Sequence, residues 1–311
     1  MTITESEGGY KMSRPKRITA KVAVPVLATV AVGAVAYAGN AADTPSAHDR
    51  SSSASAANSA RESKVDTGDP KNPATWKLPI EAYLPTKADT QFIVATRDEL
   101  IDECMKAAGY DQWTPAPDLP ELGGKTLTDW RYGIHNAGLA AKRGYHPDEA
   151  EQRAYDEAQE AGAVDDSGAD DTTLKGCVAQ ADEKAPTAQP PTLAQQISDD
   201  SYVESMNAPS VVDAFAKWSS CMKAQGYSYT KPMDANDDPR FSDPYEVKDE
   251  EIATAKADVA CRDKYDVEKV WFDAETALQQ AAIAKNQAAL EEARMDIKSA
   301  VAKAKSVSAV Q

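Results

Sequence analysis

The feature that most constrains this chain is a seven-residue phrase, Cys-Met-Lys-Ala-x-Gly-Tyr, that occurs twice, beginning at Cys104 and at Cys221. Each copy ends a stretch whose apolar residues recur at three- and four-residue intervals, which predicts an amphipathic helix. A glycine just past a helix adopts the left-handed conformation, and the apolar residue after it packs on the last turn. The phrase therefore predicts a helix that stops at Gly109 and a second that stops at Gly226.

The chain has four cysteines and three histidines, and no Cys-x-x-Cys pair. A zinc or haem site therefore lacks ligands at usable spacing. Outside the cytosol such cysteines form disulfides, and three pairings are formally open. We favour Cys104 with Cys177 and Cys221 with Cys261, because each pair joins a repeated phrase to the next cysteine downstream. Each pair then ties one helix to another, which predicts two stapled helical modules.

The N-terminus resembles a secretory signal. Basic residues from Lys11 to Lys21 precede an uncharged apolar run over 22–38 that ends in Ala-Tyr-Ala, a pattern typical of signal cleavage. Cleavage after Ala38 gives a secreted or extracytoplasmic protein, whereas an uncleaved segment gives a protein anchored to the plasma membrane. Both alternatives stay open, as does a start at Met12 in place of Met1.

The rest of the chain predicts an all-α fold. Over 39–74, Ser, Ala and charged residues without apolar periodicity indicate a disordered linker. The absence of Gly and Pro over 247–303 favours one very long helix or two. No strict heptad supports a coiled-coil dimer, so the oligomeric state stays open. The expected divisions are a signal or anchor (1–38), a linker (39–74), a first helical module (75–190), a second (191–266), and a long C-terminal helix and tail (267–311).

Net charge and motifs exclude several functions. A formal charge of −16 repels nucleic acid. The acidic run over 234–238 begins like a calcium loop, but Pro239 replaces the required glycine and Tyr245 replaces the required glutamate. The acidic run over 165–171 is interpreted as a solvated loop. We therefore expect no metal and no cofactor.

No nucleophile motif is present, because paired cysteines offer no thiolate and no serine lies in a Gly-x-Ser-x-Gly turn. A pair of facing carboxylates has no sequence signature, so a hydrolase remains an alternative. Aromatic residues and histidines near expected helix ends are the candidate binding residues, with roofing of the helical core as the alternative interpretation. They are Trp113, Trp130, Tyr132, His135, Tyr145 and His146.

Four segments together resemble uncharacterised secreted or membrane-anchored proteins of actinobacteria. They are LPIEAYLPT over 78–86, ECMKAAGY over 103–110, RYGI over 131–134 and GYHP over 144–147. The resemblance covers roughly 76–265. It implies an exported actinobacterial protein and supplies no catalytic residues.

These observations favour an exported protein of the cell envelope or the extracellular space that acts as a non-enzymatic binding or interaction module. Its expected partner is another protein or a cell-wall glycan. One alternative is a secreted carboxylate-dependent hydrolase acting on wall polysaccharide. Another is an inhibitor or partner of a different exported protein. The unrepeated stretch 130–146 is where we expect a functional signature.

Overall fold

The computed structural model describes residues 67–162 and 165–309, which belong to one compact unit. The predicted signal segment and most of the predicted linker lie outside these residues. The described part is all-helical, as the sequence predicts, and contains no strand. Within it, no helix combines the length and the apolar character needed to cross a membrane.

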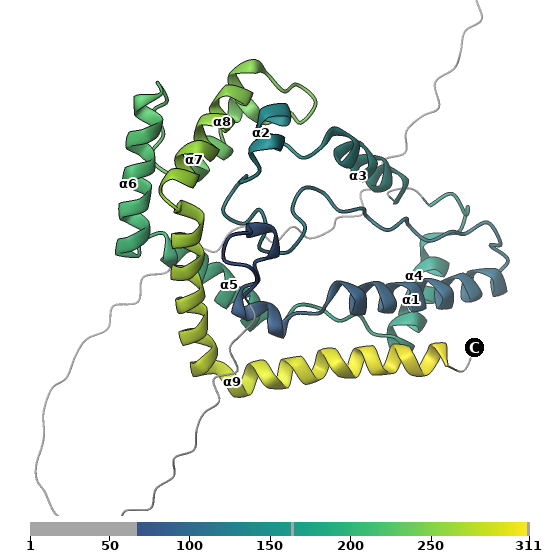
Figure 1. Ribbon diagram of the computed structural model, residues 1–311. Helices are drawn as coiled ribbons and strands as arrows, with labels where there is room; N and C mark the ends of the chain where they lie inside the picture. Colours follow the sequence, from purple (N-terminus) through teal and green to yellow (C-terminus); the bar gives the residue numbers. More distant parts are fainter. Residues whose placement is uncertain (1–66, 163–164, 310–311) are drawn as a thin grey trace, which may run out of the picture. The chain divides into compact units, whose positions relative to one another are not determined.

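Most of the helices follow one another with short connections, but a long irregular segment over 108–136 joins α1 to α2 (Figure 1). The 3₁₀ helices are η1 (Pro73–Thr75), η2 (Pro79–Tyr83) and η3 (Pro239–Phe241). The α-helices are α1 (Lys87–Ala107), α2 (Ala137–Arg143), α3 (Glu149–Gly162), α4 (Asp171–Lys184), α5 (Thr192–Ser205), α6 (Pro209–Ala224), α7 (Pro232–Asn236), α8 (Asp249–Lys264) and α9 (Val267–Ser308).

Ordered structure begins before the predicted end of the linker at residue 74. The indole of Trp76 donates a hydrogen bond to the Asp69 carbonyl at 2.8 Å, and the Asp69 amide donates to the Thr75 hydroxyl at 2.8 Å. These bonds close a turn over 67–75 against a buried tryptophan. The polar composition that suggested a linker is here the composition of a hydrogen-bonded turn.

Both copies of the repeated phrase form the same helix stop. Gly109 and Gly226 each have φ of 93°, in the left-handed region. The amide of Tyr110 donates to the Met105 carbonyl at 2.9 Å, and the amide of Tyr227 donates to the Met222 carbonyl at 3.0 Å. The amides of Gly109 and Gly226 donate to the carbonyls of Lys106 and Lys223, at 3.0 and 3.1 Å. Together these bonds form a Schellman motif at the end of α1 and at the end of α6. The prediction is confirmed.

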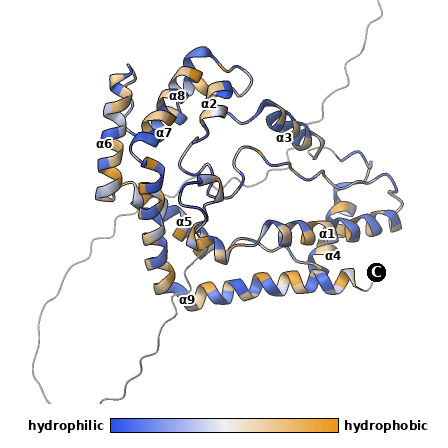
Figure 2. Cartoon of the chain, in the orientation of Figure 1, coloured by the Kyte–Doolittle hydropathy of each residue, from blue (hydrophilic) through white to orange (hydrophobic). Residues whose placement is uncertain are grey.

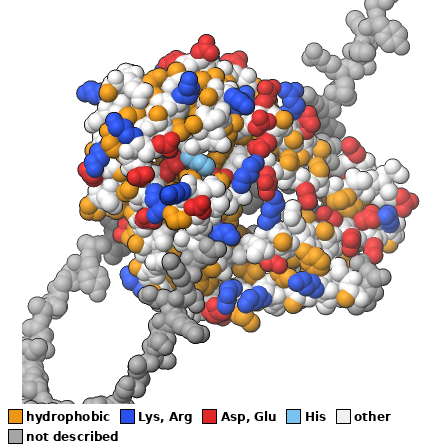
Figure 3. Space-filling model, viewed as in Figure 1, with side chains coloured by type: hydrophobic (Ala, Val, Ile, Leu, Met, Phe, Trp, Pro, Cys, Tyr) orange, Lys and Arg blue, Asp and Glu red, His pale blue; other side chains and the backbone are white. Residues whose placement is uncertain are grey.

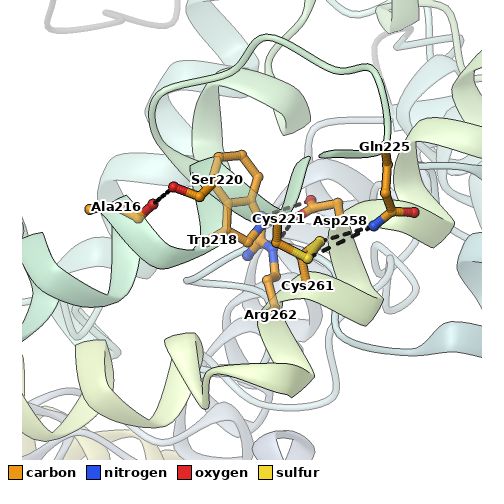
Figure 4. Close-up of a disulfide and its surroundings, with 8 residues drawn as sticks. All are labelled: Ala216, Trp218, Ser220, Cys221, Gln225, Asp258, Cys261 and Arg262. Atoms are coloured by element: carbon orange, nitrogen blue, oxygen red, sulfur yellow. Dashed lines mark hydrogen bonds and ion pairs between the residues drawn. A yellow bond between two sulfur atoms is a disulfide. The ribbon is translucent and has the colours of Figure 1, made fainter. Parts of the chain in front are cut away.

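The two predicted disulfides are also confirmed. Cys104 on α1 bonds to Cys177 on α4, and Cys221 on α6 bonds to Cys261 on α8. Figure 4 shows the second disulfide beside Trp218 on α6, whose indole points toward α8. Each disulfide therefore joins two packed helices.

The helical stretch after residue 247 is divided twice. Asp266 has φ of 50° and ψ of 36°, which separates α8 from α9. Within α9, Asn286 leaves the helical conformation, and its side-chain amide donates to the Ala282 carbonyl at 2.9 Å. Figure 1 shows α9 turning sharply at this kink. The limb before the kink packs on α5 and α6, and the limb after it runs along α1.

The buried residues form two clusters, and α9 contributes to both. In the larger one, Trp271 is surrounded by the rings of Tyr132, Tyr202 and Phe215, with centroids 5.0 to 5.2 Å away. The smaller one lies between α1, α4 and the end of α9. Hydrophobic and hydrophilic residues interleave along α9, as Figure 2 shows. The segment over 129–147, which includes α2 and comes from the first predicted module, completes the core of the second.

Candidate functional site

A row of buried charged residues runs along α8 and the start of α9. Glu251, Asp258 and Arg262 lie on α8, and Glu268 and Glu275 lie on α9, each at most 8 % exposed. Burying a charge costs free energy unless the group is paired and hydrogen-bonded. The partners of these residues therefore decide which of them are structural and which remain free to meet a ligand.

Arg262 and Asp258 satisfy each other. The Arg262 guanidinium donates to both Asp258 oxygens, at 2.6 and 3.0 Å, and the Trp218 indole donates to Asp258 at 2.8 Å (Figure 4). Arg262 also donates to the backbone carbonyl of Tyr132. Gly133 follows with φ of 100°, and a Cβ there would lie 2.6 Å from the guanidinium. The glycine thus lets the loop backbone approach the buried arginine.

Glu275 is held by the same loop. Arg131 donates from Nε to both carboxylate oxygens at 3.0 Å, and the Tyr132 hydroxyl donates at 2.8 Å. Gln279 adds a donor at 2.9 Å. Burial, reinforced by the negative charge of Glu275, raises the pKa of Tyr132, so the phenol stays protonated as a donor. The segment Arg-Tyr-Gly over 131–133 therefore contacts α8 through Arg262 and α9 through Glu275.

Glu251 is held by the next glycine-containing segment. The Tyr145 amide donates to Glu251 at 2.9 Å, and His146 Nε2 lies 3.5 Å from the same oxygen. Gly144 has φ of 61°, and a Cβ there would lie 2.2 Å from Glu251 Oε1. The segment Gly-Tyr-His therefore secures the start of α8, as Arg-Tyr-Gly secures its end.

The fifth buried charge, Glu268, faces a cavity of about 700 Å³, which we call the His135 cleft. The cleft lies between the turn over 70–76, the loop over 135–137, the end of α8 and the start of α9. Its polar lining side chains are Lys71, Asn72, His135, Asn136, Arg262, Asp263, Asp266, Glu268 and Lys269.

His135 is oriented by a buried carboxylate. Its Nε2 hydrogen-bonds Asp129, which is 4 % exposed. The other oxygen of Asp129 accepts from the Lys125 amide at 2.5 Å. Asp129 is thereby fixed by the backbone of its own loop, and it fixes the histidine ring at the mouth of the cleft. A carboxylate–histidine pair of this kind orients a ring for hydrogen bonding or proton transfer.

Glu268 Oε1 and Glu251 Oε2 are buried carboxyl oxygens that make no hydrogen bond within the described part of the chain, and of these two residues Glu268 is the one that lines the cleft. The nearest cationic atom, Arg262 Nη1, lies 3.6 Å from Glu268 Oε1 and already donates to the backbone carbonyl of Tyr132. Burial raises the pKa of Glu268 to about 8, although Arg262 opposes the shift. The carboxyl group is therefore mostly protonated at neutral pH.

The start of α9 adds donors and acceptors. Asp266 precedes the helix, and its side chain does not cap the first turn, whose amides have no intrahelical partner. The pKa of Asp263 lies above its usual value. Burial is the main cause, His135 partly opposes the rise, and the negative charge of Asp266 adds to it. Asp263 and Asp266 are both exposed. The cleft thus combines exposed carboxylates with a buried protonated carboxyl group.

The structure scatters the six candidate binding residues predicted from the sequence. Tyr132 and Tyr145 are 2 % and 7 % exposed and belong to the larger core cluster. Trp113 packs on the smaller cluster, and the half-buried Trp130 packs against Gly123. His146 meets Glu251, and of the six only His135 lines the cleft. The six do not form one aromatic surface.

Sequence reasoning missed the acidic residues of the cleft. Asp263, Asp266 and Glu268 lie in a stretch dense in charge, where a solvated helix face is the usual interpretation. One sequence signal was present. Glu251 and Asp258 are seven residues apart, and so are Glu268 and Glu275, so that the two acids of each pair lie on the same face of their helix. Such spacing of acids on an apolar face indicates buried carboxylates.

Among the described residues, no group of three or more histidine, cysteine, aspartate or glutamate side chains could hold a metal ion. Comparisons with protein families, curated proteins and solved structures find no match for this chain.

Proposed function

We propose that this chain is an exported binding protein of the cell envelope or the extracellular space, and that the His135 cleft is its ligand site. The observation that carries the proposal is Glu268, which lines the cleft and whose buried Oε1 makes no hydrogen bond within the described part of the chain. A polar atom withdrawn from water costs free energy until a partner satisfies it. The cleft volume of about 700 Å³ also falls within the range of small-molecule sites.

Export is supported by two independent observations. The two disulfides fit an extracytoplasmic location, because cytosolic thiols are kept reduced. The apolar run over 22–38 after a basic flank has the features of a secretory signal or anchor.

Acidic and basic side chains are interspersed over the face viewed in Figure 3. The expected ligand is therefore a small polar molecule or a fragment of cell-wall glycan that the cleft can enclose.

A thermal-shift screen of the purified protein against soluble wall fragments tests the proposal. A ligand that raises the melting temperature of the wild type should lose its effect on His135→Ala. The control is Glu291→Gln on α9, where the half-buried Glu291 pairs with Arg294 outside the cleft. A shift that survives in His135→Ala would place the ligand elsewhere and contradict the proposal.

A hydrolase is the second candidate, supported by the protonation of Glu268. A glycosidase needs a protonated acid beside an ionised carboxylate, and the cleft holds Glu268 beside Asp263. Release of reducing ends from wall polysaccharide, abolished by Glu268→Gln, would establish turnover. Cleft-dependent binding without turnover would leave the binding function alone.

A further inference from the structure

Carboxyl groups outnumber available cations in the His135 cleft. Arg262 is engaged by Asp258, and Lys269 is engaged by Asp273 at 2.5 and 2.6 Å. Lys71, an exposed side chain, is the remaining lysine of the cleft. Within the described part of the chain, Asp263, Asp266 and Glu268 have no ion pair of comparable length, and the closest approach is the 3.6 Å between Glu268 and Arg262.

Exposed acidic residues alone do not make a binding site, but Glu268 adds a buried carboxyl group to them. The residue is 8 % exposed and lines the cavity, and its buried Oε1 makes no hydrogen bond within the described part of the chain. A donor held in the cavity beside this carboxyl group would supply the missing partner. Since an ammonium group carries three donors and one positive charge, it satisfies a cluster of carboxyl oxygens.

We propose that the cleft binds the primary ammonium group of a small polar molecule between Asp263 and Glu268. This inference rests on the proposed binding function and names its ligand class. An ammonium group fits better than a metal ion, because the described residues contain no cluster of metal-ligating side chains. The Asn72 and Asn136 side chains remain for the polar groups of the same molecule.

Binding of a cation should release a proton. The charged groups that surround Glu268 on its neighbouring elements are Asp258, Arg262 and Asp263 of α8, Asp129 and His135 of the loop, and Lys71 of the N-terminal turn. With this environment the carboxyl group is mostly protonated at pH 7. An ammonium group beside it favours the ionised form, so the affinity should rise as the pH approaches 8.

The test is calorimetric titration of the full chain at pH 7 with glucosamine, lysine and putrescine, each paired with its N-acetylated counterpart. At least one amine should bind roughly tenfold or more tightly than its acetylated form, as expected for one charge-assisted contact. Titrations in two buffers of different ionisation enthalpy should show proton release. Glu268→Gln should abolish the release, and Asp263→Asn, at an exposed position, should weaken binding without affecting the fold.

Glu291→Gln is the matched control and should leave both affinity and proton release unchanged. Failure of all three amines to bind, or equal binding of amine and acetylated form, overturns the inference. Competition by sodium sulfate for the same site would assign the cleft to anions at the amides of α9 and also overturn it. If acetylated ligands bind and His135→Ala abolishes that binding, the proposed function stands while this inference falls.

Discussion

The hydroxyl of Tyr132 donates to the Glu275 carboxylate at 2.8 Å, across 143 residues of sequence. Both residues are fully enclosed, at 2 % and 0 % exposed. A buried carboxylate is tolerated only while its hydrogen bonds are intact. This bond therefore ties the segment over 129–147 to α9.

We expect Tyr132→Phe to lower the free energy of unfolding by about 1.5–3 kcal/mol, the usual contribution of a hydrogen bond to a charged group. Tyr245→Phe is the control, because its hydroxyl also donates to a carboxylate, Asp156 at 2.5 Å, but the residue is 50 % exposed. The control should change stability by less than about 0.5 kcal/mol. Urea denaturation measures both, and equal losses would contradict the structural role of the buried bond.

Replacement of the glycine that ends α6 should also destabilise the fold. Gly226→Ala places a Cβ in open space but at φ of 93°, so the cost is conformational, about 1–2 kcal/mol. Gly176→Ala, within α4 and also in open space, should stabilise the protein by about 0.5–1 kcal/mol. The two melting temperatures should move in opposite directions, and a rise for both would rule out the left-handed stop.

Removal of either disulfide should cost roughly 4 kcal/mol in the chain-entropy model, since the closed loops span 73 and 40 residues. The variants are Cys104→Ala with Cys177→Ala, and Cys221→Ala with Cys261→Ala. Denaturation under non-reducing conditions measures the cost. Peptide mapping of the wild type should recover the same two pairs, and a crossed pair would refute the arrangement of α1 with α4 and α6 with α8.

Stability should depend on pH through Glu268. Its pKa is about 8 in the folded protein against 4.5 ordinarily, so the folded state binds the proton more tightly than the unfolded state. The contribution is complete below pH 4.5 and is lost as the pH rises toward 8, by at most about 1.4 kcal/mol per pH unit. Glu268→Gln keeps the shape of the protonated group and should therefore be increasingly more stable than wild type over this range. Parallel curves for the two proteins, measured by denaturation from pH 4 to 9, would contradict the burial of this carboxyl group.

Local patterns were sufficient for the ends of α1 and α6. The repeated phrase predicted both Schellman stops, because glycine and the tyrosine after it act within one helical turn of their own position. The pairing of Cys104 with Cys177 followed from the order of the cysteines along the chain. The break at Asp266 had no local signal, since an aspartate in the left-handed conformation is held there by the packing on either side of it.

The candidate site was only partly accessible to sequence reasoning. The stretch 130–146 was expected to hold a functional signature, and one of its residues, His135, lines the cleft. The tyrosines of the same stretch are core residues that hold Glu275 and Glu251. An aromatic residue in a polar loop has the same sequence appearance whether it covers a core or meets a ligand, so burial decides between the two.

The sequence by itself determined the helical class and the two helix stops, because each depends on spacing within a segment, and it favoured one of three possible cysteine pairings, which the structure shows. Only the tertiary structure decided which charges are buried and which of them lack a partner. Asp258 and Glu268 are both acids in a charged helical stretch, yet Arg262 and Trp218 satisfy the first while the second faces a cavity. That difference arises because desolvation and pairing depend on neighbours distant in the chain.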